Sequence, residues 1–313
     1  MPSFVMRPGD LSFYAQMTLI RQTEQAFFTL YERGLLAGTV HTSIGQEACA
    51  VGVMAALDCA RDVIFSSHRA HGHYLAYCDD VEGLVAELLG RRNGLVGGVG
   101  GTQHLHRRNF YTNGIQGGIV PNAAGAALAE KLAGSGAIVA VFLGDGTLGE
   151  GVVYESMNLA SLWSLPLLFV LEDNGYAQST PKHLVHAGAL ADRPTAFGIA
   201  TRSLLADDPA AVYSAAAEAV AQVRKTSRPF FLALTTYRLA PHSKGDDLRD
   251  RAELAAAQAR DPLATLGRRL VGDARAGADA AAAERIERAV AAALDERAQT
   301  LAGYAEQARW QPV

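Results

Sequence analysis

Two turns near the middle of the chain contain residues that could hold a metal ion together with a phosphate group. Each turn follows a short apolar segment, 137–143 or 167–171, of the kind that forms a buried strand. The first turn carries Asp145 between two glycines, and the second carries Asn174. A stretch with helical periodicity lies between the segments, so we expect a crossover between parallel strands. Both turns then lie at the carboxyl edge of one sheet, where α/β sheets bind ligands.

One interpretation of the first turn is a dinucleotide site. Gly144, Gly146 and Gly149 satisfy the G-x-G-x-x-G spacing after a strand and before a helix. Glu172 or Asp173 would then hold a ribose. Asp145 argues against this interpretation, because a carboxylate within a phosphate-binding turn repels a pyrophosphate unless a divalent cation lies between them.

A magnesium ion in the same turn would remove the repulsion between Asp145 and a phosphate group. Asp145 supplies one oxygen ligand, the amide of Asn174 supplies a second, and a main-chain carbonyl near Tyr176 supplies a third. Two phosphate oxygens nearly complete the octahedral shell that Mg²⁺ requires. We therefore favour a diphosphate bridged by Mg²⁺ over a dinucleotide.

The amino-acid sequence of the whole segment resembles that of a known family. GDGTLGEGVVYESMNLASLWSLPLLFVLEDNGYA, residues 144–177, resembles the thiamine diphosphate motif in the alpha subunit of 2-oxo acid dehydrogenase E1 components, of the pyruvate, branched-chain and acetoin types. The resemblance extends to about Leu270. It implies an α/β fold that binds thiamine diphosphate, with a parallel sheet and helices on both faces. Residues 1–313 would form a single diphosphate-binding (PP-type) domain with N-terminal covering helices and a helical C-terminal tail.

Residues in other segments match catalytic and phosphate-binding positions of this family. The resemblance implies that Arg69 and Arg238 help to neutralise the diphosphate. It also implies that His242 and His71 transfer protons or stabilise intermediates, and His41 is a third catalytic candidate. The metal ligands are expected to be Asp145, Asn174 and Tyr176; the residues expected to bind the cofactor are Arg69, Gly114, Gln116, Gly144, Asp145, Gly146, Asn174, Tyr176, Arg238 and His242.

Three positions depart from the family pattern. His68 stands where the family has an aromatic residue before the arginine. The stretch 114–117, which the family lays along the aminopyrimidine ring, has Gln116 in a usually apolar place. Leu239-Ala240-Pro241 replaces an aromatic-His-Gly or aromatic-Arg-Gly sequence before His242. These departures leave the identity of the substrate open.

The chain offers no convincing carboxylic acid to activate the aminopyrimidine ring, and Glu47 is interpreted as a structural residue at a helix start. The resemblance places the activating glutamate on the pyrimidine-binding domain of a separate beta subunit. We therefore expect an obligate beta partner in an α2β2 assembly, with a 2-oxo acid as substrate. The acyl or hydroxyalkyl unit would pass to a lipoyl group on a carrier protein.

Other functions remain open at this stage. A two-subunit transketolase-like enzyme would use the many histidines and Gln116 to bind a polyhydroxylated ketose, and an acetoin-cleaving E1 is a further variant. Gly149-Glu150-Gly151 resembles transketolases and some acetoin-type subunits alike. A nucleotide-dependent oxidoreductase and a non-catalytic paralogue serving as an assembly scaffold are the remaining alternatives.

Composition excludes several classes of partner. The chain has 313 residues, of which 49% are hydrophobic, and a formal net charge of −4, so no basic field points to nucleic acid or a membrane surface. No apolar run approaches the roughly 20 residues of a membrane span, and the first ten residues do not suggest a signal peptide. Three cysteines without metal-ligand spacing suggest a cytoplasmic protein.

The remaining elements are expected from periodicity and end signals. Ser43 and Gln46 have capping-box spacing for a helix over 44–57. The helix after the first turn is expected to pack through one stripe: Leu148, Val152, Ser156, Leu159 and Trp163. Further helices are expected over 10–33, 121–134, 209–224 and from 254 onward, strands over 62–65 and 230–236, and long loops over 94–118 and 177–196.

Overall fold

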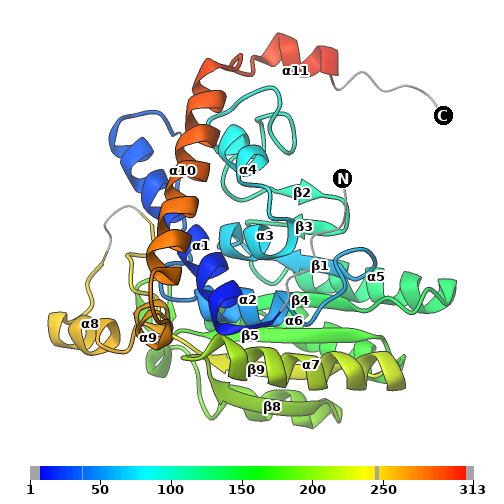
Figure 1. Ribbon diagram of the computed structural model, residues 1–313. Helices are drawn as coiled ribbons and strands as arrows, with labels where there is room; N and C mark the ends of the chain where they lie inside the picture. The colour runs from blue at the N-terminus through cyan, green and yellow to red at the C-terminus, as the bar shows by residue number, and fades with distance from the viewer. Residues whose placement is uncertain (1–7, 37, 244–246, 308–313) are drawn as a thin grey trace.

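A seven-stranded sheet runs through the part of the chain that the computed structural model describes, residues 8–36, 38–243 and 247–307 (Figure 1). Strand β2 pairs antiparallel with β3, and the other neighbours in the sheet are parallel. The strand order is β2 (His106–Arg107), β3 (Phe110–Thr112), β1 (Val63–Ser66), β4 (Val139–Gly144), β5 (Leu167–Asp173), β9 (Phe230–Thr235) and β8 (Ala200–Leu205).

Helices cover both faces of this sheet, which confirms the expected α/β class. Successive residues of β4 point to opposite faces, and the strand is buried on both, so alternate side chains enter two separate cores. One core is shared with α1 (Asp10–Glu32), α2 (Glu47–Met54), α3 (His71–Cys78), α4 (Val81–Leu88), α7 (Pro209–Thr226) and α10 (Ala274–Asp295). The other is shared with α5 (Ile119–Ala133), α6 (Gly151–Leu162) and the 3-10 helix η3 (Leu190–Phe197).

The central crossover has the predicted order. Strands β4 and β5 are parallel neighbours, with Val139 opposite Leu167 and Gly144 opposite Glu172. A one-turn 3-10 helix, η1 (Asp145–Gly149), precedes α6. The register brings the ends of both strands to the same edge, so the two turns predicted to bind a ligand lie side by side.

The predicted packing face of α6 is only partly right, because Leu148 and Ser156 are buried but the C-terminal part of the stripe is exposed. Leu159 and Trp163 are 37% and 46% exposed, whereas Val153, Met157 and Ala160 are fully buried. The stripe was extrapolated from Leu148, but Leu148 belongs to η1. Because a 3-10 turn has fewer residues per turn than an α-helix, it shifts the phase of the helix that follows.

The predicted capping box is also wrong. Helix α2 begins at Glu47, and the Ser43 hydroxyl donates to Glu24 Oε1 at 2.9 Å instead of capping a helix end. The Ser43 backbone N–H donates to the same oxygen at 2.8 Å. The buried Glu24 carboxylate on α1 therefore holds the segment before α2. The spacing of Ser43 and Gln46 in the sequence does not reveal that Glu24 is the partner of Ser43.

Several short elements were not predicted. The loop over 94–118 contains the β2–β3 hairpin. The loop over 177–196, with the residue on either side of it, contains β6 (Tyr176–Ala177), β7 (Thr180–Pro181), η2 (Lys182–Leu184) and η3. Edge strand β8 follows this loop. Strand β8 is largely exposed, so it lacks the apolar run that identifies the inner strands.

The C-terminal region is helical, as expected, with α8 (Arg251–Gln258), α9 (Pro262–Arg269), α10 and α11 (Leu301–Gln307). Helix α10 packs along α1 and α4 through Ala282, Ile286 and Ala293 (Figure 1). No helix in the described residues is long and apolar enough to cross a membrane.

Candidate functional site

A cavity of about 400 Å³ opens at the carboxyl edge of β1, β4 and β5. Strand ends and loops far apart in the sequence line it, and these include most of the residues singled out from the sequence. The lining comprises His41, Gln46, Ser67, His68, Arg69, Gln103, Gly114, Gln116, Gly144, Asp145, Gly146, Thr147, Glu150, Glu172, Asn174, Tyr176, Ala177, Gln178, Arg238 and His242.

Asp145 lies at the end of β4 with only one of its carboxylate oxygens engaged. Oδ1 accepts from the Gly146 backbone N–H at 3.0 Å, whereas Oδ2 is buried with no hydrogen-bond partner among the described residues. Burial, and then the charge of Asp173, raise the pKa of Asp145 to about 6. A buried carboxylate oxygen without a partner is costly, and a cation in the cavity would compensate for it.

Asn174 lines the same cavity and directly follows β5, the strand next to β4. Its Oδ1 accepts from the Tyr176 N–H at 3.1 Å, and its Nδ2 donates to Gln46 Oε1 at 3.2 Å. The Tyr176 N–H can only donate, so it fixes which amide atom of Asn174 is the oxygen, and that oxygen keeps a second lone pair for a ligand. The Tyr176 ring turns to Glu253, with a hydroxyl contact of 2.7 Å, so its main-chain carbonyl is the group available as a ligand.

Two glycines of the lining lie very close to neighbouring atoms. A Cβ atom on Gly146 would lie 2.9 Å from Cβ of Ala177, and one on Gly114 would lie 2.2 Å from Oε1 of Gln103. The turn therefore packs tightly under β6, and the chain at Gly114 packs tightly against the side chain of Gln103.

Arg69 and Arg238 bring two buried guanidinium groups to one wall of the cavity. Arg69 Nη2 and Arg238 Nη1 lie 3.3 and 3.1 Å from His242 Nδ1. Burial, and then the charge of Arg238, lower the pKa of Arg69 to about 9. Two like charges that face the same cavity favour an anionic ligand such as a diphosphate.

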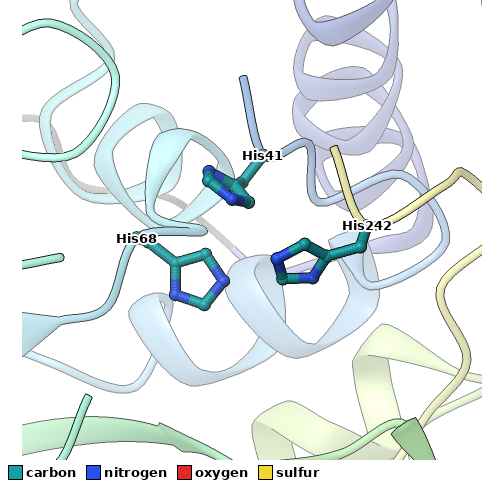
Figure 2. Close-up of side chains that lie close together, drawn as sticks. All are labelled: His41, His68 and His242. Carbon is teal, nitrogen blue, oxygen red and sulfur yellow. The ribbon is translucent and has the colours of Figure 1, made fainter. Parts of the chain in front are cut away.

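His41, His68 and His242 converge in the same cavity (Figure 2), and His242 lies directly beside the two arginines. The His41 ring centroid lies 4.6 Å from that of His68 and 4.8 Å from that of His242. One nitrogen from each ring lies within 4.8 Å of the other two. The sequence singled out His41 and His242 as catalytic candidates, and the fold brings His68 to the same place.

His71 is not brought to the cavity. It is fully buried, and its Nδ1 contacts Glu24 Oε2 at 2.9 Å while its Nε2 contacts the Thr102 carbonyl at 3.1 Å. Both partners accept hydrogen bonds, so both ring nitrogens are used within the protein. The geometry thus does not support the predicted proton-transfer role. Instead, His71 links Glu24 on α1 to Thr102 in the loop over 94–118.

Among the polar residues of the site, Glu172 was considered only as a ribose ligand, and Gln46 only as part of a capping box. Glu172 lines the cavity, and His73 Nε2 lies 3.2 Å from its Oε1. Gln46 holds Asn174 across 128 positions of sequence. Neither has a local motif, although Gln46 stands next to Glu47 in the segment IGQEA.

The carboxylates that a dinucleotide would need for its ribose are engaged elsewhere. Glu172 pairs with His73, and Asp173 pairs with Lys182 at 2.5 Å.

Glu47 is fully buried, bonds the Arg21 guanidinium and accepts from the Gly45 N–H at 2.9 Å. It therefore has the structural position at a helix start that was expected of it.

Sequence comparisons agree with this geometry. Residues 15–308 match the family described as "Dehydrogenase E1 component". The pyruvate dehydrogenase E1 alpha subunit of Zymomonas mobilis is 42% identical over 246 residues, covering 77% of this chain and 70% of that protein. The alpha subunit of acetoin:2,6-dichlorophenolindophenol oxidoreductase from Bacillus subtilis is 39% identical over 240 residues, covering 75% and 72%. The mitochondrial, somatic-form pyruvate dehydrogenase E1 alpha subunit of Rattus norvegicus is 35% identical over 272 residues, covering 85% and 69%.

Proposed function

Because this chain belongs to the dehydrogenase E1 component family, we propose that its cavity holds the diphosphate of thiamine diphosphate together with Mg²⁺. The chain is the alpha subunit of a thiamine diphosphate-dependent enzyme of the pyruvate and acetoin dehydrogenase type. It works with a beta subunit on a reaction that decarboxylates a 2-oxo acid. The cofactor supplies the carbanion chemistry, and the protein supplies binding and orientation.

The observation that carries the magnesium proposal is the pair of oxygens at the strand ends. Asp145 Oδ2 has no hydrogen-bond partner among the residues that the structure describes, and Asn174, whose Oδ1 accepts from the Tyr176 N–H, lines the same cavity. With the Tyr176 carbonyl, these are hard oxygen donors of the kind that Mg²⁺ selects. Gly144 and Gly146 flank the carboxylate, and Gly146 lets the turn pack under β6.

The cationic wall would hold the diphosphate charge. Arg69 and Arg238 bind phosphate oxygens, and both also contact His242, so phosphate binding fixes the orientation of that imidazole. His242 and His41 then exchange protons at the reacting substrate. Gly114 and Gln116 lie along the aminopyrimidine side of the cavity, where Gln116 bonds both His68 and Thr147.

The beta subunit would supply what the cavity lacks. Its lining holds three carboxylates, of which Glu172 pairs with His73, Asp145 faces the metal position and Glu150 is exposed at the start of α6. We propose that a glutamate of a pyrimidine-binding domain on the beta subunit activates the cofactor, in an α2β2 assembly. A lipoyl group on a carrier protein would accept the acyl unit.

Calorimetry with thiamine diphosphate tests the cofactor site. The chain is co-produced with a beta subunit and titrated with and without Mg²⁺. We expect tight binding only with Mg²⁺, and loss of that dependence in Asp145→Ala, with Glu155→Ala on the exposed side of α6 as the matched control. Binding of NAD without a metal, or unchanged metal dependence in Asp145→Ala, would contradict the proposal.

An assay with an artificial electron acceptor tests the reaction. We expect turnover of pyruvate, branched-chain 2-oxo acids or acetoin. Turnover of a ketose phosphate without any of these would support a transketolase-like enzyme instead. Residues 1–313 are proposed to act as one diphosphate-binding domain, and a cytoplasmic location stays a prediction from the cysteine count.

A further inference from the structure

Gln46 is the N-cap residue of helix α2, yet its side chain makes no hydrogen bond that caps the helix. The side chain is buried and lines the cavity. Its Oε1 accepts instead from Nδ2 of Asn174 at 3.2 Å, across 128 positions of the sequence. Buried polar groups take a hydrogen-bond partner, and Gln46 takes its partner at the strand end that carries a proposed metal ligand.

The amide of Asn174 is held at both ends by partners that favour one orientation. The Tyr176 N–H can only donate, so the atom it contacts at 3.1 Å is the oxygen Oδ1. Nδ2 is then the donor, and Gln46 meets it with a carbonyl oxygen. A flip of the Asn174 amide would set N–H groups against each other at Tyr176 and two oxygens against each other at Gln46.

The backbone around Gln46 is fixed by the residues on either side of it. Glu47 is fully buried and pairs with the Arg21 guanidinium of α1. A Cβ atom on Gly45 would lie 2.5 Å from the carbonyl oxygen of Tyr237, so the segment packs directly against the chain that follows β9. The Gln46 side chain therefore extends toward the cavity from a backbone that is held in place.

The orientation of the Asn174 amide decides whether it can bind a cation. Oδ1 has two lone pairs and uses one for the Tyr176 N–H, whereas Nδ2 carries only N–H donors. Mg²⁺ takes oxygen ligands in nearly ideal octahedral geometry, so an amide that turns or drifts is a poor ligand. Groups that orient a metal ligand from behind typically contribute about 10- to 100-fold to metal affinity.

We propose that Gln46 is a positioning residue for the metal site, whose Oε1 holds Nδ2 of Asn174 and so keeps Oδ1 available to the cation. The inference rests on the proposed function, because the ion concerned is the Mg²⁺ that accompanies the diphosphate. Gln46 acts through Asn174 and supplies no ligand itself. Helix α2 thereby contributes to the metal site through its N-cap residue alone.

The test measures the Kd of Mg²⁺ in the α–β complex by calorimetry, with thiamine diphosphate in excess. Gln46→Met keeps the length of the side chain and removes the acceptor, so the Kd should rise about 10-fold. Gln46→Glu keeps an acceptor oxygen and should bind Mg²⁺ at least as tightly as the wild type. Gln22→Met makes the same change on α1, where Gln22 contacts Thr18 and Asp279, and should leave the Kd unchanged.

An Asn174→Asp background separates this role from a general loosening of the cavity. A carboxylate has an oxygen at both positions, so either orientation presents a ligand to the cation. Adding Gln46→Met to Asn174→Asp should therefore change the Kd by less than about twofold. A merely structural role would weaken Mg²⁺ binding equally in both backgrounds.

Three results would overturn the inference while leaving the proposed function intact. They are an unchanged Kd in Gln46→Met, an equal loss in both backgrounds, and a loss in Gln46→Glu as large as that in Gln46→Met. If Gln46→Met does not assemble, Gln46→Asn, which withdraws the acceptor by one methylene group, should show the same weakening. If the wild-type complex binds thiamine diphosphate without any dependence on Mg²⁺, the proposed function itself fails and this inference falls with it.

Discussion

Glu87 and Asp145 are two buried carboxylates beside glycine-rich segments, and the protein treats them in opposite ways. Glu87 is fully buried on α4 and accepts four backbone N–H groups, from Val96, Gly98, Gly100 and Gly101, at 2.7 to 3.2 Å. Asp145 accepts one N–H and keeps its second oxygen without a partner in the described structure.

The difference distinguishes a carboxylate that holds the chain from one that we propose binds a cation. Every oxygen of Glu87 is occupied, and the loop it organises leads to Thr102 and Gln103 beside the cavity. Asp145 is poorly satisfied by the protein, which costs free energy that a bound cation would return. Burial alone does not separate the two residues; the count of satisfied oxygens does.

The largest effect is expected from Glu87→Ala. Four backbone donors would lose their acceptor at once, so the free energy of unfolding should fall by at least about 3 kcal/mol. Denaturant unfolding measures this loss, and Glu82→Ala, on the exposed side of α4, should change it by less than about 0.5 kcal/mol. A small loss in Glu87→Ala would show that the loop holds its shape without the carboxylate.

Asp145→Asn should weaken cofactor binding without lowering stability, which is the opposite of the effect expected from Glu87→Ala. It should weaken Mg²⁺-dependent binding of thiamine diphosphate by about 100-fold, because a charged ligand to the metal is lost. The metal-free protein should be as stable as the wild type or more so, since a poorly satisfied buried charge is removed. Calorimetry and thermal unfolding of the same samples test both halves. A clear loss of stability would mean that Asp145 resembles Glu87 after all.

His71 and His242 extend the comparison to imidazoles. His71→Asn should lower the free energy of unfolding by about 2 kcal/mol, because the buried contacts with Glu24 and Thr102 are broken. His242→Asn should leave stability nearly unchanged and lower kcat. If His71→Asn instead lowered kcat at wild-type stability, the predicted catalytic role would be restored.

The smallest effect is expected far from the site. Asp208 caps α7 by accepting from the Ala210 N–H at 3.0 Å, and Asp208→Ala should cost about 1 kcal/mol of stability. Asp208→Asn keeps the cap and serves as the control. Both variants should bind the cofactor as the wild type does, and a change in affinity would show that α7 influences the carboxyl edge of the sheet.

Much of the fold could be read from local sequence. Strands β4 and β5 are continuous apolar runs of strand length. The N-cap residue Asp208 followed by Pro209 marks the start of α7 in the local sequence. The phase of α6 could not be read, because the 3-10 turn before it breaks the helical period. Strand β8 could not be read either, because an exposed edge strand needs no apolar pattern.

The sequence by itself determined the turn that we propose binds a metal ion. Asp145 lies directly after one inner strand and Asn174 directly after the next, so parallel pairing alone places them together. Only the tertiary structure decided the fate of the histidines. Whether His71 or His68 faces the cavity depends on Glu24, Thr102 and Gln116, and the nearest of these lies 31 positions from His71. Burial and hydrogen-bond partners are properties of the packed chain, and no local pattern encodes them.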